Sequence, residues 1–117
     1  MSIYIIESNE ILANCIKDAL PKDTKIFPDI YSAWDAIQDN IPSLIFLDIL
    51  PTGPDGFTLL NQLVSLKETE NIPIILLSAI NLKNYNLSDY NIKRILNKET
   101  FTPMDIKDCA EKYYAKQ

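Results

Sequence analysis

The sequence predicts an α/β fold in which five short parallel strands alternate with five helices. Short apolar runs rich in β-branched residues recur along the chain, and amphipathic stretches with helical spacing separate them. Units this short connect through right-handed crossovers, which build a parallel sheet. The length of 117 residues is enough for one domain with a core and too small for two. We therefore expect residues 1–117 to form a single domain.

Five apolar runs are the strand candidates. The third is apolar on both faces, as expected of a central parallel strand, and the second is weak, as expected of an edge strand. Strands and connections of this size predict a flavodoxin-like doubly wound sheet with the strand order 2-1-3-4-5. The candidate runs are Ser2–Ile6, Thr24–Phe27, Ser43–Leu47, Pro73–Leu77 and Arg94–Leu96.

The segments between and after these runs are the helix candidates. The first, Asn9–Leu20, has Leu12, Cys15, Ile16, Ala19 and Leu20 at helical spacing. Ser32-Ala33-Trp34-Asp35 resembles a capping box at the start of the second helix. The fourth candidate, Asn81–Asn91, is rich in asparagine, so we expect a short or irregular helix there. The remaining candidates are Gly56–Lys67 and a last helix that begins at Thr102-Pro103, with threonine as the cap.

Composition excludes several classes of protein. The net charge of −5 argues against direct binding of nucleic acid, which needs clustered basic residues. The absence of histidine removes histidine-based catalysis and histidine zinc ligands. No apolar run approaches the length of a membrane span, and the N-terminus lacks a signal sequence, so we expect a cytoplasmic protein with no membrane contact. Cys15 and Cys109 are expected to be reduced core residues.

Polar side chains stand directly after four of the five apolar runs. Glu7 and Ser8 follow the first run, Asp48 the third, Ser78 the fourth and Lys98 the fifth. Because the carboxyl ends of parallel strands meet at one edge of a sheet, we expect these side chains to share a site. Taken singly, each has an ordinary structural role as a helix cap, a turn residue or a solvated charge. Their joint placement favours a common chemical use.

Phosphoryl transfer suits this set of groups. A pair of carboxylates can hold Mg²⁺, which prefers oxygen ligands and keeps several waters. A lysine and a hydroxyl can hold the other oxygens of the phosphoryl group, because this chemistry depends mainly on positioning and charge neutralisation. Asp48 would be the nucleophile and would form an aspartyl phosphate.

Two stretches resemble the receiver domain of response regulators in two-component signalling. In the first, the apolar strand Ile45–Leu47 leads to Asp48, a proline-containing loop and then Asp-Gly, ending at Gly56. In the second, Ile74–Ala79, an apolar strand ends in Ser-Ala where the family has Thr or Ser followed by Ala. Lys98 closes a strand where the family has its lysine. The resemblance runs over essentially the whole chain.

The resemblance implies a role for each of these residues. Asp48 is similar to the phosphoacceptor, Ser78 to the switch hydroxyl and Lys98 to the lysine that contacts the phosphoryl group. Magnesium would be held by Glu7, by Asp48, by the backbone carbonyl of Leu50 and, in place of a second acidic residue, by Ser8. The phosphoryl donor would be a sensor histidine kinase or a phosphotransfer protein, and an unidentified downstream protein would read the modification. Such a domain is a signalling switch and not a metabolic enzyme, although it catalyses its own phosphorylation.

Three positions depart from the family pattern. Ser8 replaces a carboxylate and so lowers the charge of the metal site. Glu99 stands where the family has a proline in a cis linkage, and Ile95 where many members have an aromatic residue that rotates on activation. These departures motivate an alternative, a pseudo-receiver that binds proteins without phosphorylation. A flavodoxin-like cofactor or nucleotide binder is disfavoured, because residues 7–10, Glu-Ser-Asn-Glu, contain no glycine and would repel phosphate.

Overall fold

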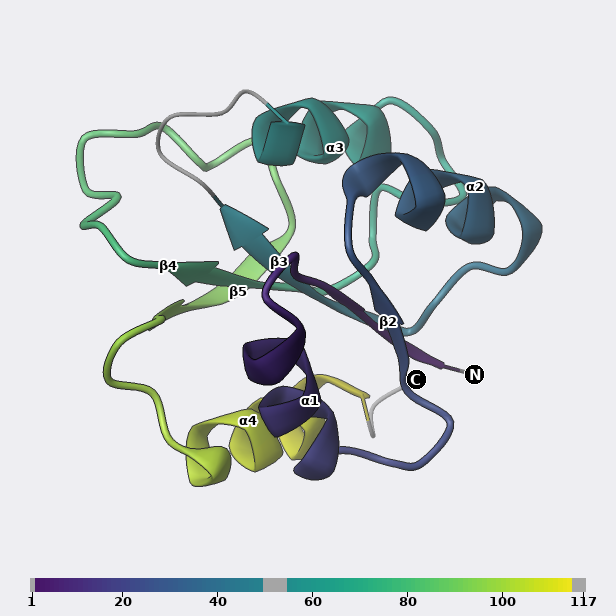
Figure 1. Ribbon diagram of the computed structural model, residues 1–117. Helices are drawn as coiled ribbons and strands as arrows, with labels where there is room; N and C mark the ends of the chain where they lie inside the picture. The colour runs from purple at the N-terminus through teal and green to yellow at the C-terminus, as the bar shows by residue number, and fades with distance from the viewer. Residues whose placement is uncertain (1, 50–54, 115–117) are drawn as a thin grey trace.

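A five-stranded parallel sheet in the order β2-β1-β3-β4-β5 forms the centre of the computed structural model, which describes residues 2–49 and 55–114 (Figure 1). The predicted fold class and strand order are confirmed. All five apolar runs become strands, and the fifth extends beyond the predicted residues at both ends. The strands are β1 Ile3–Ile6, β2 Lys25–Phe27, β3 Leu44–Ile49, β4 Ile74–Ser78 and β5 Ile92–Asn97.

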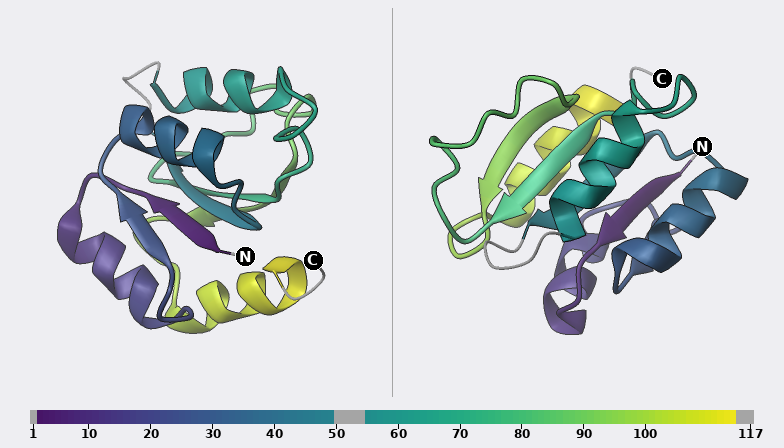
Figure 2. Two further views of the ribbon diagram at one scale, coloured as in Figure 1. Left: turned by 90° about the vertical axis from the view of Figure 1, so that its right-hand side faces the viewer. Right: turned by 90° about the horizontal axis from the view of Figure 1, so that it is seen from above.

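Helices cover both faces of the sheet. One face carries α1 (Glu10–Asp18) and α4 (Pro103–Cys109), and α4 continues into a π-helical turn, Ala110–Tyr114 (Figures 1 and 2). The other face carries α2 (Ile30–Asp39) and α3 (Asp55–Val64). Each face has its own core of buried apolar side chains. The sheet between them is therefore shielded from water on both sides, which explains why the residues of β3 are buried throughout.

Side-chain caps set the start of three helices. Asn9 accepts a hydrogen bond from the backbone N–H of Leu12 at the start of α1. Thr102 caps α4, as predicted, and it forms a reciprocal capping box with Asp105. The predicted capping box at Ser32 is wrong, because α2 begins two residues earlier. There the carboxylate of Asp29 accepts the N–H of Ser32, so Ser32 lies inside the first turn.

The predicted helix over Asn81–Asn91 is absent, so the described residues contain four α-helices instead of five. Two asparagine side chains explain the difference. Asn81 Oδ1 accepts the N–H of Lys83, and Asn86 Oδ1 accepts the N–H of Ser88. Such local bonds offer the backbone an alternative to the helical hydrogen bonds. Leu82 is nevertheless buried, so the segment still covers part of the α3 side of the sheet.

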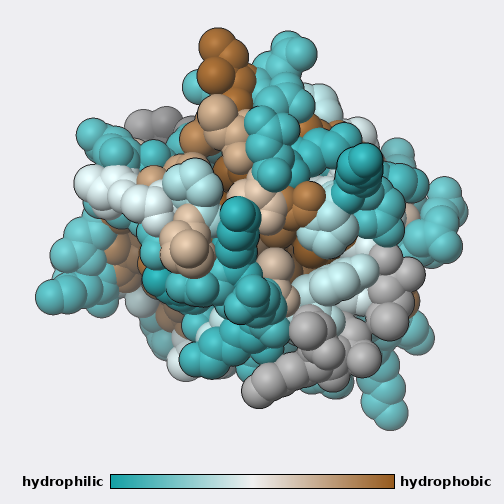
Figure 3. All heavy atoms as spheres, turned by 90° about the horizontal axis from the view of Figure 1, so that it is seen from below, coloured by the Kyte–Doolittle hydropathy of each residue, from teal (hydrophilic) through white to brown (hydrophobic). Residues whose placement is uncertain are grey.

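The surface over α1 and α4 is largely hydrophilic, with apolar side chains in separate patches (Figure 3).

Cys109 is buried as predicted, but the prediction for Cys15 is wrong, because this thiol is exposed. At 3.6 residues per turn, Cys15 lies about 100° around α1 from the buried Ile16, beyond the edge of the apolar stripe. No helix within residues 2–49 and 55–114 is long and apolar enough to cross a membrane.

Candidate functional site

Three charged side chains from three strand ends meet at the carboxyl edge of the sheet. Glu7 follows β1, Asp48 is the penultimate residue of β3, and Lys98 follows β5. The ammonium Nζ of Lys98 lies 3.0 Å from Asp48 Oδ1 and 3.2 Å from Glu7 Oε1. The lysine therefore bridges two carboxylates that belong to neighbouring strands of the sheet, β1 and β3.

Both carboxylates are withdrawn from water. Glu7 is 2% exposed and Asp48 9% exposed, whereas the side chain of Lys98 retains 19% exposure. Glu7 Oε1 and Asp48 Oδ1 have no hydrogen-bond partner of good geometry, although each lies within ion-pair distance of Lys98. Two buried carboxylates facing one ammonium carry a net charge of −1 when all three groups are ionised. The cluster therefore has capacity for further positive charge.

Burial dominates the titration of Asp48. Desolvation, reinforced by the negative charge of Glu7, raises the pKa of Asp48 from 3.8 to about 6, even though the nearby ammonium of Lys98 acts in the opposite direction. Partial burial by itself would lower the pKa of Lys98. The nearby carboxylates of Asp48 and Glu7 outweigh that effect, so the pKa of Lys98 lies above its ordinary 10.5. The ammonium therefore stays charged throughout the range in which Asp48 ionises.

Two backbone contacts hold Glu7 in place, one with β2 and one at the start of α1. The N–H of Glu7 donates to the carbonyl of Phe27 in β2, and the second carboxylate oxygen, Oε2, accepts the N–H of Asn9. One oxygen of Glu7 is thus used at the start of α1, and the other faces Lys98. Ser8 is exposed and is not part of the buried cluster. Leu50, the predicted backbone ligand, lies outside the described residues.

Ser78 lies at the end of β4, in a turn. Its hydroxyl donates to the carbonyl of Ile80 at 2.9 Å and accepts the N–H of Ile80 at 3.1 Å. The backbone carbonyl of Ser78 accepts the N–H of Lys98 at 2.9 Å, which joins the end of β4 to the start of the next turn. A hollow of about 450 Å³ opens beside Ser78, lined by residues 78–83 and 95–97. Ile95 is exposed beside it.

The turn that carries Lys98 contains a residue that the sequence reasoning missed. Asn97 Oδ1 accepts the N–H of Glu99 at 2.8 Å, and the Asn97 carbonyl accepts the N–H groups of Thr100 and Phe101. Proline has no backbone N–H and could not donate this bond, so Glu99 contributes to the turn through its backbone N–H. Asparagine at the end of an apolar run is a known turn signal and could have identified it.

The donor set fits one hard cation with few protein ligands. Within the described parts of the chain, no three Asp, Glu, Cys or His side chains gather into a metal-binding group. Glu7 and Asp48 supply two buried carboxylates with unsatisfied oxygens, and carboxylates are the ligands that Mg²⁺ prefers. Since Mg²⁺ usually retains several waters, two carboxylates suffice for a weak site.

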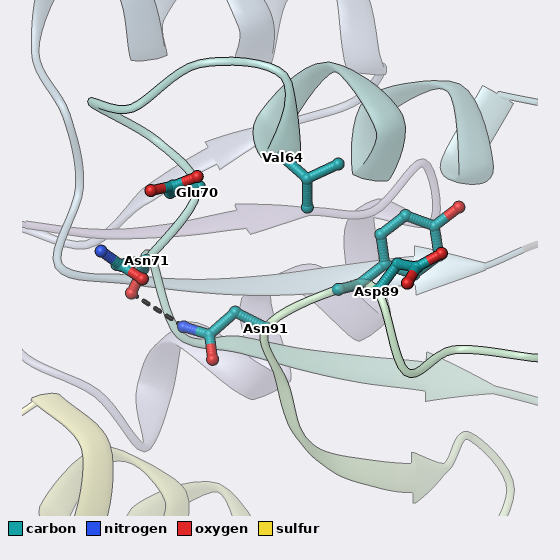
Figure 4. Close-up of a pocket in the computed structure, with 6 residues that line it drawn as sticks. Val64, Glu70, Asn71, Asp89 and Asn91 are labelled. Carbon is teal, nitrogen blue, oxygen red and sulfur yellow. Dashed lines mark hydrogen bonds between the residues drawn. The ribbon is translucent and has the colours of Figure 1, made fainter.

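A second polar hollow, of about 310 Å³, lies at the opposite edge of the sheet (Figure 4). It is formed by the end of α3 and by residues that precede β4 and β5, including Val64, Glu70 and Asp89. The side-chain amide of Asn91 donates to the carbonyl of Asn71 at 2.8 Å across it. Because its residues precede the strands, this hollow is separate from the Glu7–Asp48–Lys98 cluster.

Two curated proteins align with about two thirds of the chain. It is 24% identical over 85 residues to protein-glutamate methylesterase/protein-glutamine glutaminase 2 of Pseudomonas aeruginosa. It is 26% identical over 80 residues to the transcriptional regulatory protein CseB of Streptomyces avermitilis. The alignments cover 68% and 66% of this chain but span only 24% and 33% of the length of those proteins. No family model matches the sequence.

Solved structures share the fold over nearly the whole chain. The receiver domain of response regulator 1452 from Francisella has a TM-score of 0.81 at 22% identity, covering 98% of this chain and 97% of that one. The receiver domain of NtrX from Brucella abortus has a TM-score of 0.81 at 22% identity, covering 98% and 99%. The Mn²⁺-bound form of response regulator Rcp1 has a TM-score of 0.72 at 18% identity, covering 97% and 93%. The chain therefore has the fold of a response-regulator receiver domain.

Proposed function

We propose that this chain is a receiver that accepts a phosphoryl group on Asp48 and thereby changes its binding to a partner protein. The observation that carries the proposal is the buried cluster itself. A carboxylate that is 9% exposed lies 3.0 Å from a lysine and shares that lysine with a second buried carboxylate. Burying two acids around one ammonium costs stability, so a role in chemistry accounts for the cluster better than a role in folding.

In the proposed reaction, an oxygen of Asp48 attacks the phosphorus of a phosphohistidine or of a small acyl phosphate. A new O–P bond forms as the bond from phosphorus to the leaving group breaks, and the leaving group keeps the electron pair. Asp48 must be ionised to attack, and with a pKa of about 6 in the metal-free cluster this carboxyl is largely ionised at neutral pH. Lys98 lies close enough to Asp48 to stabilise the charge of the transferred group.

The cofactor in this proposal is Mg²⁺, held by Glu7 and Asp48 with water completing its shell. The cation would neutralise negative charge on the transferred phosphoryl oxygens. Rcp1, which shares the fold, has been solved with Mn²⁺, a divalent cation that carboxylates also bind. Affinity should be low, because Ser8 provides no second acidic charge at the end of β1. In a thermal-shift titration, Mg²⁺ should raise the melting temperature of the wild type and leave Glu7→Gln nearly unchanged.

A second candidate function is a pseudo-receiver that binds a protein without phosphorylation. Two observations favour it: Lys98 already bridges the two carboxylates, and Ile95, at the position of the expected aromatic switch, is an exposed aliphatic residue. In either case we propose a signalling switch or interaction module and not a metabolic enzyme. The phosphoryl donor of the leading proposal is a histidine kinase or phosphotransfer protein, and a downstream protein is its target.

The deciding experiment is intact-mass spectrometry after incubation with acetyl phosphate and Mg²⁺. The wild type should gain the mass of one phosphoryl group, and hydroxylamine should remove it, as expected of an acyl phosphate. Asp48→Asn should gain nothing, whereas Asp39→Asn, which alters an exposed aspartate at the end of α2, should behave as the wild type. If the folded wild type gains no mass at any Mg²⁺ concentration in a titration, the pseudo-receiver becomes the better account.

A further inference from the structure

The position of Lys98 depends on a short hydrogen-bonded turn. Its own backbone N–H donates to the carbonyl of Ser78, which fixes the start of the turn against β4. On the other side, the side chain of Asn97 closes over Lys98 by accepting the N–H of Glu99 at 2.8 Å. Lys98 is therefore the middle residue of an Asx turn, with its neighbours joined to each other.

We propose that Asn97 is a positioning residue for the proposed phosphoryl transfer, acting through Lys98; this inference rests on the proposed function. The side-chain amide of Asn97 restrains the backbone of Lys98, which in turn directs the ammonium to Asp48 Oδ1 and Glu7 Oε1. Asn97 itself is exposed and pairs with Ser78 in the strand register, so it has no place in the buried cluster.

The restraint matters because lysine is flexible. A lysine side chain has four rotatable bonds, and holding it in one arrangement costs rotamer entropy. Neither of the two carboxylate oxygens facing Lys98 makes a hydrogen bond of good geometry with it. The ion pairs alone therefore do not fix the ammonium in direction, and the backbone turn has to supply that direction. A shift of roughly 1 Å in a catalytic group can lower a rate by up to about a hundredfold.

The turn should survive loss of the Asn97 side chain. Thr100 and Phe101 donate to the backbone carbonyl of residue 97, which any residue supplies, and the freed N–H of Glu99 lies at an exposed position. Asn97→Ala should therefore fold and lose only the restraint. Asn97→Asp keeps a side-chain oxygen that can accept the same bond. Asn86→Ala is the matched control, since it removes another Asx turn, at the N–H of Ser88, between β4 and β5.

Two measurements on these variants test the inference. The first is the rate of phosphorylation by acetyl phosphate at saturating Mg²⁺, which should fall about tenfold in Asn97→Ala and stay within twofold of the wild type in the other two. The second is the NMR order parameter of the Lys98 Cε methylene in unmodified protein without metal. It should fall in Asn97→Ala alone, while thermal unfolding confirms that every variant is folded.

The two readouts separate failure of this inference from failure of the proposed function. If the wild type is not phosphorylated, the proposed function fails, and the order parameter still reports whether Asn97 restrains Lys98. Equal rates and equal order parameters in the wild type and Asn97→Ala would overturn the inference. So would an equal loss in Asn97→Ala and Asn86→Ala, because the effect would then be a general loss of turn structure.

Discussion

Replacing Asp48 by asparagine should make the protein more stable at neutral pH. The wild-type carboxylate is held where burial and the charge of Glu7 disfavour its ionised form. Asparagine has nearly the same shape and no charge, so it removes the cost of ionising this position. Glu7 keeps Lys98 as its partner, at 3.2 Å, so the substitution leaves no new buried charge unpaired.

The expected gain follows from the pKa of Asp48. In the unfolded chain this carboxyl titrates near 3.8, and in the folded protein its pKa is about 6. Between these values the folded state binds more protons than the unfolded state, so stability falls as the pH rises through this window. The two pKa values differ by about 2, and each unit of difference corresponds to about 1.36 kcal/mol. The free energy of unfolding of the wild type should therefore fall by about 3 kcal/mol between pH 4 and pH 7. Asp48→Asn does not show this fall.

Urea unfolding at a series of pH values measures this difference. Trp34, the single tryptophan, belongs to α2 and packs against the core, so its fluorescence reports unfolding. The stability of Asp48→Asn relative to the wild type should grow steadily from pH 4 to pH 7. The control is Asp29→Asn. A hydrogen bond from the backbone of Ser32 lowers the pKa of Asp29 below 3.8, so the pH dependence due to this group lies below that value and the relative stability of Asp29→Asn should change little from pH 4 to pH 7. Parallel curves for Asp48→Asn and the wild type would refute the reasoning.

Three further substitutions test the site and the fold. Lys98→Met should lower the free energy of unfolding by about 3 kcal/mol at pH 8, because it leaves two buried carboxylates without their cation. The loss should be smaller at pH 5, where one of the carboxylates is protonated. Urea unfolding at both pH values measures the difference. Gly56→Ala should cost about 1–3 kcal/mol, because the new Cβ would lie 2.5 Å from Ile49 Cδ1, and Ile49→Val should recover part of that loss in the double variant. Thr102→Ala should cost about 1 kcal/mol through loss of the cap on α4, whereas Thr102→Ser should cost little; failure of thermal unfolding to separate these two variants would contradict the capping role.

Much of the fold could be predicted because its signals are local. Apolar runs bounded by turn residues marked all five strands, and short connections required a parallel sheet. The same connectivity predicted that Glu7, Asp48 and Lys98 lie at one edge of the sheet. Where two local signals compete, as at the expected fourth helix and at the start of α2, the predictions were wrong. Asn81 and Asn86 bond to nearby backbone in place of a helix, and the cap of α2 is not at Ser32.

Apolar periodicity and chain connectivity are properties of neighbouring residues, and they were enough to predict the sheet, its strand order and the set of charged residues at its carboxyl edge. How those charges interact depends on the packed structure. It placed one lysine between two carboxylates, turned Ser8 and Cys15 outward and joined Asn97 to Glu99 around Lys98. The raised pKa of Asp48 likewise depends on burial and on Glu7 and Lys98, which are distant from it in the sequence, and electrostatic energies depend on distance and solvent exposure that no local pattern specifies.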